Sequence, residues 1–487
     1  MDTCNIPPEI KTFFLQFPGQ TLLIKGKPGT GKTILSFEIL KEICEERNGL
    51  YLSTRINPDK LYSLFPWVKN IVPKKNVVNA TPGKIIKAIG AELSVLRKPF
   101  DFGTALAFFK MLYEDAEEMD NPVVVIDSWD ALLNFMNLED KGISFTQSLC
   151  EFCHEVGTHL ILVSEMAYQT PLDYIVDGLV TLLDTEVHGE ASGGQVYSEQ
   201  LESRTVRQIE LNKLRGVKRQ QKSYVFTLEN GRFKYFPPYR RTSISKVKPS
   251  KNDGKNQTSG ISDFDKITGG LEKGTLTLFV VEHGVGLRYV PFLDQIAMAL
   301  VAKNVGVVRV RSVGAVLPKN RESTKRFRGI YQFKPKAWIT WRLEKIFPTT
   351  KEYMQFLEVI KEESSEIVEL SLMESRKEYI DFLKEVKKKH PRVVEFLGLD
   401  TFETLYGAEN TLKLLDEAIA RAVENDEILI AVAKRGMKSV EMITKLANTH
   451  FVFKDLMGSL FIYGVQPRTG LYNVSLDEEG IHLTPVV

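Results

Sequence analysis

Short apolar runs alternate along the chain with longer segments whose apolar residues recur at helical spacing. Six of the runs predict buried strands: Thr21–Lys25, Val123–Ile126, His159–Val163, Thr275–Val281, Val393–Leu399 and Glu427–Ala433. Strands that alternate with helices in this way are typical of parallel sheets covered by helices on both faces. The pattern therefore predicts an α/β fold with mainly parallel sheets flanked by helices.

The same order of elements occurs twice. In each half, an apolar strand leads into a glycine-rich turn, a helix-like stretch follows, and a later strand ends beside Asp127 or Asp400. Between the halves, Arg240–Gly260 is basic, polar and nearly free of large apolar residues, as linkers often are. We therefore expect tandem domains at 1–239 and 260–487, joined by a linker at 240–259, with the second domain a degenerate copy.

Composition limits the function classes. The 487 residues have a formal net charge of +2, so no overall field favours nucleic acid or an acidic membrane. No apolar stretch approaches the ~18 residues of a membrane helix, and the first residues do not resemble an export signal. Four cysteines in a chain of this kind are typical of reduced cytosolic thiols. We expect a cytoplasmic protein without membrane contact.

One segment carries clear chemistry. It matches the phosphate-loop pattern G-x-x-x-x-G-K-[ST], and its positions are Gly26, Lys27, Pro28, Gly29, Thr30, Gly31, Lys32 and Thr33. A strand precedes it and a helical pattern follows it, as the motif requires. Backbone amides and the helix N-terminus would bind phosphate, Lys32 would neutralise the terminal phosphates, and the Thr33 hydroxyl would ligate Mg²⁺.

Asp127 follows the apolar strand Val123–Ile126. Its carboxylate is therefore expected at the carboxyl end of a central strand, at the same edge of the sheet as the phosphate loop. There it would hold Mg²⁺ through water. The alternative is that Asp127 only caps a helix or turn at the strand end.

The chain resembles the KaiC-like branch of the RecA-type ATPases, in two copies. The matching segments are GKPGTGKT from Gly26, GLYLS from Gly49, VVVIDSWDAL from Val123, HLILVSE from His159, VDGLVTL from Val176 and KLRG from Lys213, and GISDFDKITGGLEKGTLTLFVVE from Gly260 opens the second copy. Within that branch, the chain is most similar to the archaeal gas-vesicle regulator D type, which has one good phosphate loop. The resemblance implies tandem RecA-like domains and ATP, rather than GTP, as the nucleotide.

The resemblance also implies self-association, because such proteins commonly form hexameric rings with ATP between subunits. A K-x-R-G segment of one subunit then reaches the γ-phosphate held by its neighbour. Lys213 and Arg215 match that segment and are candidate trans-acting fingers. The alternative is that they are solvated basic residues beside Lys218 and Arg219.

Two departures from the family pattern matter. Arg55 and Ile56 stand where the family carries two glutamates that prepare the attacking water. A positioned base typically contributes a rate factor of ~10²–10⁴, so we expect at most a slow ATPase. In the second copy, Leu287 and Arg288 replace the phosphate-binding lysine and the magnesium-binding threonine. We expect that half to be a structural or regulatory partner, with Asp400 retained as a strand-end cap.

The leading hypothesis is a regulatory protein in which ATP gates assembly or the binding of a protein partner. The alternative is a DNA-stimulated RecA-type ATPase that acts on nucleic acid. A basic cluster favours this alternative mildly: Lys319, Arg321, Lys325, Arg326 and Arg328.

Overall fold

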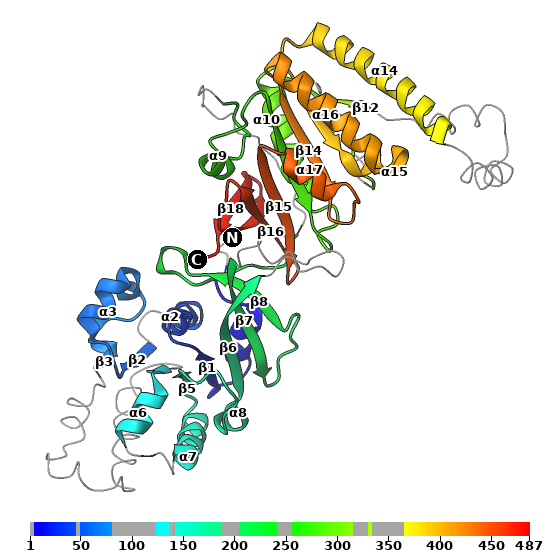
Figure 1. Ribbon diagram of the computed structural model, residues 1–487. Helices are drawn as coiled ribbons and strands as arrows, with labels where there is room; N and C mark the ends of the chain where they lie inside the picture. The colour runs from blue at the N-terminus through cyan, green and yellow to red at the C-terminus, as the bar shows by residue number, and fades with distance from the viewer. Residues whose placement is uncertain are drawn as a thin grey trace. The chain divides into compact units, whose positions relative to one another are not determined.

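The computed structural model describes residues 4–44, 49–79, 122–136, 138, 142–187, 204–240, 256–314, 330–333 and 365–487. The chain divides into two compact units. The first contains the described residues up to 187, residues 204–237 and Val486–Val487, and the second contains the described residues from Pro238 to Pro485. Each unit is an α/β domain built on one nine-stranded sheet (Figure 1). The predicted linker residues Asn256–Ser259 belong to the second unit, where the Thr258 and Ser259 side chains are buried.

The first unit has the strand order β3-β2-β4-β5-β1-β6-β7-β8-β9. Its strands are β1 (Thr21–Gly26), β2 (Gly49–Ser53), β3 (Val77–Asn79), β4 (Val123–Asp127), β5 (His159–Ser164), β6 (Gly178–Val187), β7 (Arg204–Leu214), β8 (Ser223–Thr227) and β9 (Lys234–Tyr235). The six strands from β3 to β6 in this order run parallel, and β7 to β9 continue the sheet as an antiparallel meander.

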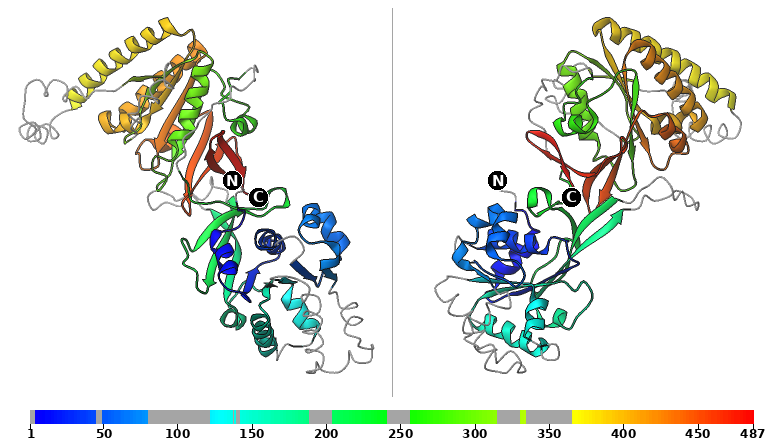
Figure 2. Two further views of the ribbon diagram at one scale, coloured as in Figure 1. Left: turned by 180° about the vertical axis from the view of Figure 1, so that it is seen from behind. Right: turned by 60° about the vertical axis from the view of Figure 1, so that its left-hand side comes forward.

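Helices cover both faces of this sheet, as Figure 2 shows in its right-hand view. They are α1 (Pro8–Gln16), α2 (Lys32–Ile43), α3 (Pro58–Leu64), α6 (Trp129–Phe135), α7 (Gly142–Glu155) and α8 (Leu172–Ile175). Alternation along β1 explains the two layers. Leu22 and Ile24 pack in the core that α1 and α2 cover, whereas Leu23 packs in the core that α6 and α7 cover.

The second unit repeats the strand order as β12-β11-β13-β14-β10-β15-β16-β17-β18. Its strands are β10 (Thr275–Val281), β11 (Gly306–Val310), β12 (Ile330–Phe333), β13 (Val393–Gly398), β14 (Ile428–Lys434), β15 (Thr449–Leu456), β16 (Ser459–Gln466), β17 (Leu471–Asp477) and β18 (Gly480–Pro485). Its helices are α9 (Ser262–Thr268), α10 (Val290–Ala302), α14 (Ser365–Lys389), α15 (Leu399–Tyr406), α16 (Ala408–Asn425) and α17 (Val440–Leu446). The predicted tandem α/β fold of RecA type is confirmed, because both sheets share one topology.

Candidate phosphate-binding site

The phosphate-loop pattern forms the turn between β1 and α2, at the carboxyl edge of the parallel strands. Gly29 and Gly31 have φ angles of 84° and 97°, which side chains rarely adopt, and Gly31 is the N-cap of α2. A Cβ on Gly26 would lie 2.7 Å from the backbone oxygen of Leu182. The three glycines are therefore required by the backbone, and they let the loop fold over the start of the helix.

Lys32 folds back over this loop. Its Nζ donates hydrogen bonds to the carbonyl oxygens of Gly26, at 2.7 Å, and Lys27, at 2.8 Å. Burial lowers the pKa of the Lys32 ammonium, while the negative charges of Glu165, Asp127 and Asp130 oppose that shift. A bound phosphate would supply acceptors to an ammonium that is already positioned and only partly balanced by carboxylates.

Thr33 and Asp127 meet in the structure. The Thr33 hydroxyl donates to Asp127 Oδ2 at 2.6 Å, and the buried Tyr51 hydroxyl donates to the same oxygen at 2.6 Å. The helix after β4 is capped by Ser128, whose side chain accepts from the Ala131 amide, so Asp127 does not serve as that cap. A hydroxyl and a carboxylate side by side are hard oxygen ligands that fit Mg²⁺.

Sequence reasoning missed Tyr51, which lies in β2, next to β4 in the sheet. Burial, and then the charge of Asp127, raise the pKa of this phenol well above its usual range. Tyr51 therefore stays protonated and donates its hydrogen bond, which fixes the orientation of the Asp127 carboxylate. No local pattern could have shown this role, because it depends on strand pairing.

The neighbouring strand ends bring Arg55 and Glu165 together as an ion pair. Arg55 follows β2, and Glu165 follows β5 directly. The Glu165 amide donates to Asp130 Oδ2 at 2.6 Å, which fixes the strand end. Ile56 packs against the core rather than facing this edge as a carboxylate would. Glu165 was missed as well, although its place immediately after an apolar strand could have indicated it.

Arg207 of β7 adds a cation at the loop. Its guanidinium donates to the Gly29 carbonyl oxygen at 3.2 Å and pairs with Asp184 at 3.1 Å. No pattern in the sequence singled out Arg207 as a residue of the loop. Its contact with the loop arises because β7 pairs with β6, which pairs with β1.

The candidate finger residues lie elsewhere. Lys213 donates to the carbonyl oxygens of Asp173, Tyr174 and Val176, at 2.6–3.2 Å, at the short helix α8. Arg215 pairs with Asp177 at 2.7 Å and is 57% exposed. These partners are not part of the phosphate loop of the same chain, so Lys213 and Arg215 are not brought together with Lys32. Lys213 is also not simply solvated, since three carbonyl oxygens accept hydrogen bonds from its ammonium group.

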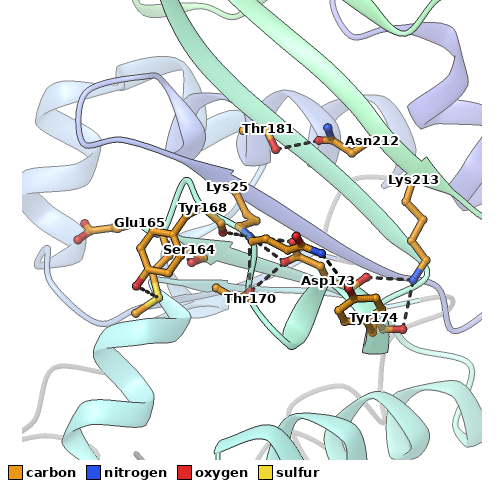
Figure 3. A network of polar contacts seen from close by, with 12 residues as sticks. Lys25, Ser164, Glu165, Tyr168, Thr170, Asp173, Tyr174, Thr181, Asn212 and Lys213 are labelled. Carbon is orange, nitrogen blue, oxygen red and sulfur yellow. Dashed lines mark hydrogen bonds and ion pairs between the residues drawn. The ribbon is translucent and has the colours of Figure 1, made fainter.

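Lys25, in the strand that leads into the loop, holds α8 from the other side (Figure 3). It is only 2% exposed, and its ammonium pairs with Asp173 at 2.8 Å and donates to the Tyr168 carbonyl. A buried ammonium is tolerated only when it is paired and hydrogen-bonded in this way. The Lys25 and Lys213 ammonium groups thus fasten the same helix to β1 and to β7.

The loop of the second unit differs in its chemistry. Arg288, opposite Thr33 in the sequence comparison, donates to the carbonyl oxygens of Val285, at 3.0 Å, and Gly458, at 3.0 Å. It also pairs with Asp455 at 2.5 Å. Leu287, opposite Lys32, is 45% exposed and offers no charge. The guanidinium is bound to the protein's own acceptors, at the position where the first unit has the Thr33 hydroxyl.

The expectation that Asp400 caps the strand end needs correction. Strand β13 ends at Gly398, and Asp400 lies in the first turn of α15. With Gly284 placed opposite Gly29, the strand pairings put Gly398 opposite Asp127, because Asp127 pairs with Val163 and Gly398 with Val432.

A side chain does not fit at this position. A Cβ on Gly398 would lie 2.4 Å from the Ser312 backbone nitrogen, closer than real Cβ contacts occur. Asp400 itself pairs with Lys434 at 2.8 Å and accepts from the Val313 amide at 3.0 Å. The second unit therefore lacks both the phosphate lysine and a counterpart of the carboxylate beside it.

The basic cluster from Lys319 to Arg328 lies outside the described residues. In the part of the chain that the structure describes, no helix is both long and apolar enough to cross a membrane.

The first unit is similar to a known P-loop domain. Residues 10–202 match the family model described as the P-loop domain of the GvpD gas vesicle protein. Over 281 residues the chain is 29% identical to Protein GvpD2 of Halobacterium salinarum, a match that covers 55% of this chain and 54% of the relative. It is 26% identical to Protein GvpD1 of the same organism, covering 55% of this chain and 49% of the relative. The chain thus spans about half the length of each relative, and its residues 10–202 are similar to the GvpD P-loop domain.

Proposed function

We propose that the first unit binds ATP with Mg²⁺ and that the protein is a KaiC-like regulatory protein. The observation that carries this proposal is the 2.6 Å contact between the Thr33 hydroxyl and Asp127, beside a buried Lys32 ammonium. These are the groups that a triphosphate with its metal requires, in the strand–loop–helix context that the motif requires. Magnesium, when bound, would neutralise charge on the β- and γ-phosphates.

Each residue has a defined task in this proposal. The loop amides bind the phosphates, and Lys32 transfers its hydrogen bonds from the loop carbonyls to phosphate oxygens. The Thr33 hydroxyl and the Asp127 carboxylate, which Tyr51 orients, would hold the metal, Asp127 through water. Arg55 and Ile56 cannot accept a proton from water, so hydrolysis is slow or absent.

The proposed output is a change in assembly or in the binding of a protein partner. A nucleotide shifts such an equilibrium only when it binds the two states differently. The exposed Arg215 is the better candidate to reach a nucleotide in a neighbouring subunit, because Lys213 would first have to leave three carbonyl acceptors. Lys213 and Arg215 both lie outside residues 10–202, the segment that the family model matches.

The test measures binding and turnover of MgATP on wild type beside Lys32→Ala. We expect binding in the wild type, weakened by at least about tenfold in Lys32→Ala, with slow turnover or none. Arg376→Ala, a substitution in an exposed ion pair of α14, is the matched control and should bind as wild type does.

Equal affinity in wild type and Lys32→Ala would contradict the proposed site. Rapid turnover stimulated by DNA would instead support the nucleic-acid ATPase. Circular dichroism and a melting curve of each variant would show that the loss of binding is not a loss of folding.

A further inference from the structure

We propose that Arg55 binds the γ-phosphate of the nucleotide and that Glu165 competes with this phosphate for the Arg55 guanidinium. The inference rests on the proposed function, since it places a nucleotide in the loop of the first unit. It assigns a specificity task to a pair of residues: the distinction between a triphosphate and a diphosphate.

The backbone around Arg55 is held firmly at the site. The Ser53 hydroxyl donates to the Ile56 carbonyl oxygen at 2.7 Å and accepts from the Ile56 amide at 3.2 Å. The Thr54 amide donates to the Asp127 carbonyl oxygen at 2.8 Å. The turn that carries Arg55 is therefore fastened to the strand end that carries the candidate magnesium carboxylate.

Glu165 approaches from the other neighbouring strand. Its amide is held by Asp130, and its side chain points away from the Lys25 cluster (Figure 3). The charge of Glu165 raises the pKa of Lys32 and that of Arg55 lowers it, so both act on the ammonium that would meet the terminal phosphates. The pair lies at the site itself, because the Thr54 amide is bonded to Asp127, whose carboxylate accepts from Thr33 of the phosphate loop. The Arg55 side chain is 51% exposed.

The second unit supplies an independent comparison. With Gly284 opposite Gly29, the strand pairings put Val313 opposite Arg55 and Lys434 opposite Glu165. These two positions also meet there, because Lys434 Nζ donates to the Val313 carbonyl oxygen at 3.0 Å. The fold alone therefore brings the two strand ends together. The position of Arg55 carries a guanidinium in the unit whose phosphate loop is intact, and valine in the unit whose loop has lost its lysine.

The chemistry explains the selectivity. A guanidinium presents a planar fork of donors that matches two oxygens of a carboxylate or of a terminal phosphate. A γ-phosphate offers this acceptor group beyond the β-phosphate, whereas a diphosphate does not reach as far. ATP would therefore draw Arg55 away from Glu165, and ADP would leave the ion pair in place.

The test compares the affinities of a non-hydrolysable ATP analogue and of ADP, each with Mg²⁺, for the full chain. Arg55→Gln should weaken analogue binding by about tenfold and leave ADP binding unchanged. Glu165→Gln should tighten analogue binding, because it removes the competing acceptor. In the Arg55→Gln background, Glu165→Gln should have no further effect on the ratio of the two affinities. Arg376→Gln is the control, since its exposure of 51% and that of its partner Glu417, 34%, resemble those of the Arg55 pair.

Three results would overturn the inference. Equal changes in the affinities for the analogue and for ADP would show that Arg55 acts only through its long-range charge. A gain from Glu165→Gln that persists without Arg55 would show that Glu165 acts directly on the phosphates. Wild-type affinities in the Arg55→Gln variant would show that Arg55 does not contact the γ-phosphate. If the wild type binds neither nucleotide, the proposed function fails first, and that failure is visible before any variant is compared.

Discussion

Under the proposed function, Asp127 is the residue on which the metal chemistry would depend. One of its oxygens accepts hydrogen bonds from both Thr33 and Tyr51, so the carboxylate is oriented before any metal arrives. Such pre-orientation by a neighbouring hydrogen bond is what tunes metal ligands in general. Under the proposed function, the other carboxylate oxygen would accept from metal-bound water.

Replacing Asp127 by asparagine tests this arrangement with little change of shape. The amide oxygen can still accept from Thr33 and Tyr51, but the negative charge is lost. We expect Asp127→Asn to lose about ten- to hundredfold of the Mg²⁺-dependent gain in ATP affinity. Binding measured with Mg²⁺ and with a chelator gives that gain. An undiminished gain would mean that the metal is held elsewhere.

His159 gives a second prediction at this scale, in the pH dependence of stability. This buried side chain accepts from the Gln20 amide through Nδ1, and burial lowers its pKa to about 4. In the unfolded chain the pKa is ~6.5, so only the unfolded state takes up a proton between these values. The stability present above pH ~6.5 is therefore lost as the pH falls towards 4.

From this difference in pKa, the free energy of unfolding is expected to fall by about 3 kcal/mol on acidification. Denaturant unfolding of wild type and His159→Gln at pH 7 and pH 4.5 measures it. The variant should be less stable than wild type at pH 7 and should lose less stability on acidification. Parallel losses in both proteins would show that other groups cause the acid sensitivity.

At the scale of elements, the sequence predicted the core strands well. The predicted strands Thr21–Lys25 and His159–Val163 each end one residue before the strand observed, and Thr275–Val281 is identical to β10. These strands are buried on both faces, so their apolar runs are continuous and easily recognised. The prediction was wrong at Leu399, because an apolar residue in the first turn of α15 continues the run of β13.

The phosphate loop and Asp127 could also be predicted, because the motif is local and because parallel strands end at one edge. Tyr51 and Arg207 could not, since each depends on the pairing of strands far apart in the sequence. Glu165 was missed although its place directly after the apolar strand β5 could have indicated it. The strand order is set by long-range packing, which a single sequence does not reveal.

The loop of the second unit allows a test of whether the loop motif alone is sufficient to bind a nucleotide. Leu287→Lys combined with Arg288→Thr would restore the loop motif there. We still expect one nucleotide per chain, because Gly398 stands opposite Asp127 and the Ser312 backbone leaves no room for a side chain. Calorimetric titration gives the stoichiometry. Two equivalents bound to the double variant would show that the loop alone is sufficient.

At the scale of the whole molecule, two sheets share one strand order while only one loop keeps its chemistry. Under the proposed function, the nucleotide acts on the assembly through the first unit. Arg215, exposed and paired only with Asp177 among the contacts described here, is the residue that could reach a neighbour.

Sedimentation in the presence of ATP analogue, ADP or no nucleotide checks this proposal. We expect the analogue to change the sedimentation of wild type and Arg215→Ala to remove that change while still binding nucleotide. Arg376→Ala should behave as wild type does. Identical sedimentation of wild type under all three conditions would contradict gating of assembly.

The repeated topology has a practical consequence. Positions 55 and 313 occupy equivalent places at the ends of β2 and β11, one beside a complete phosphate loop and the other beside an incomplete one. A spectroscopic label at either position would experience the same solvent and temperature, beyond the ends of equivalent strands. The difference between the two signals would then report the nucleotide itself. The label at position 313 would serve as an internal reference for the label at position 55.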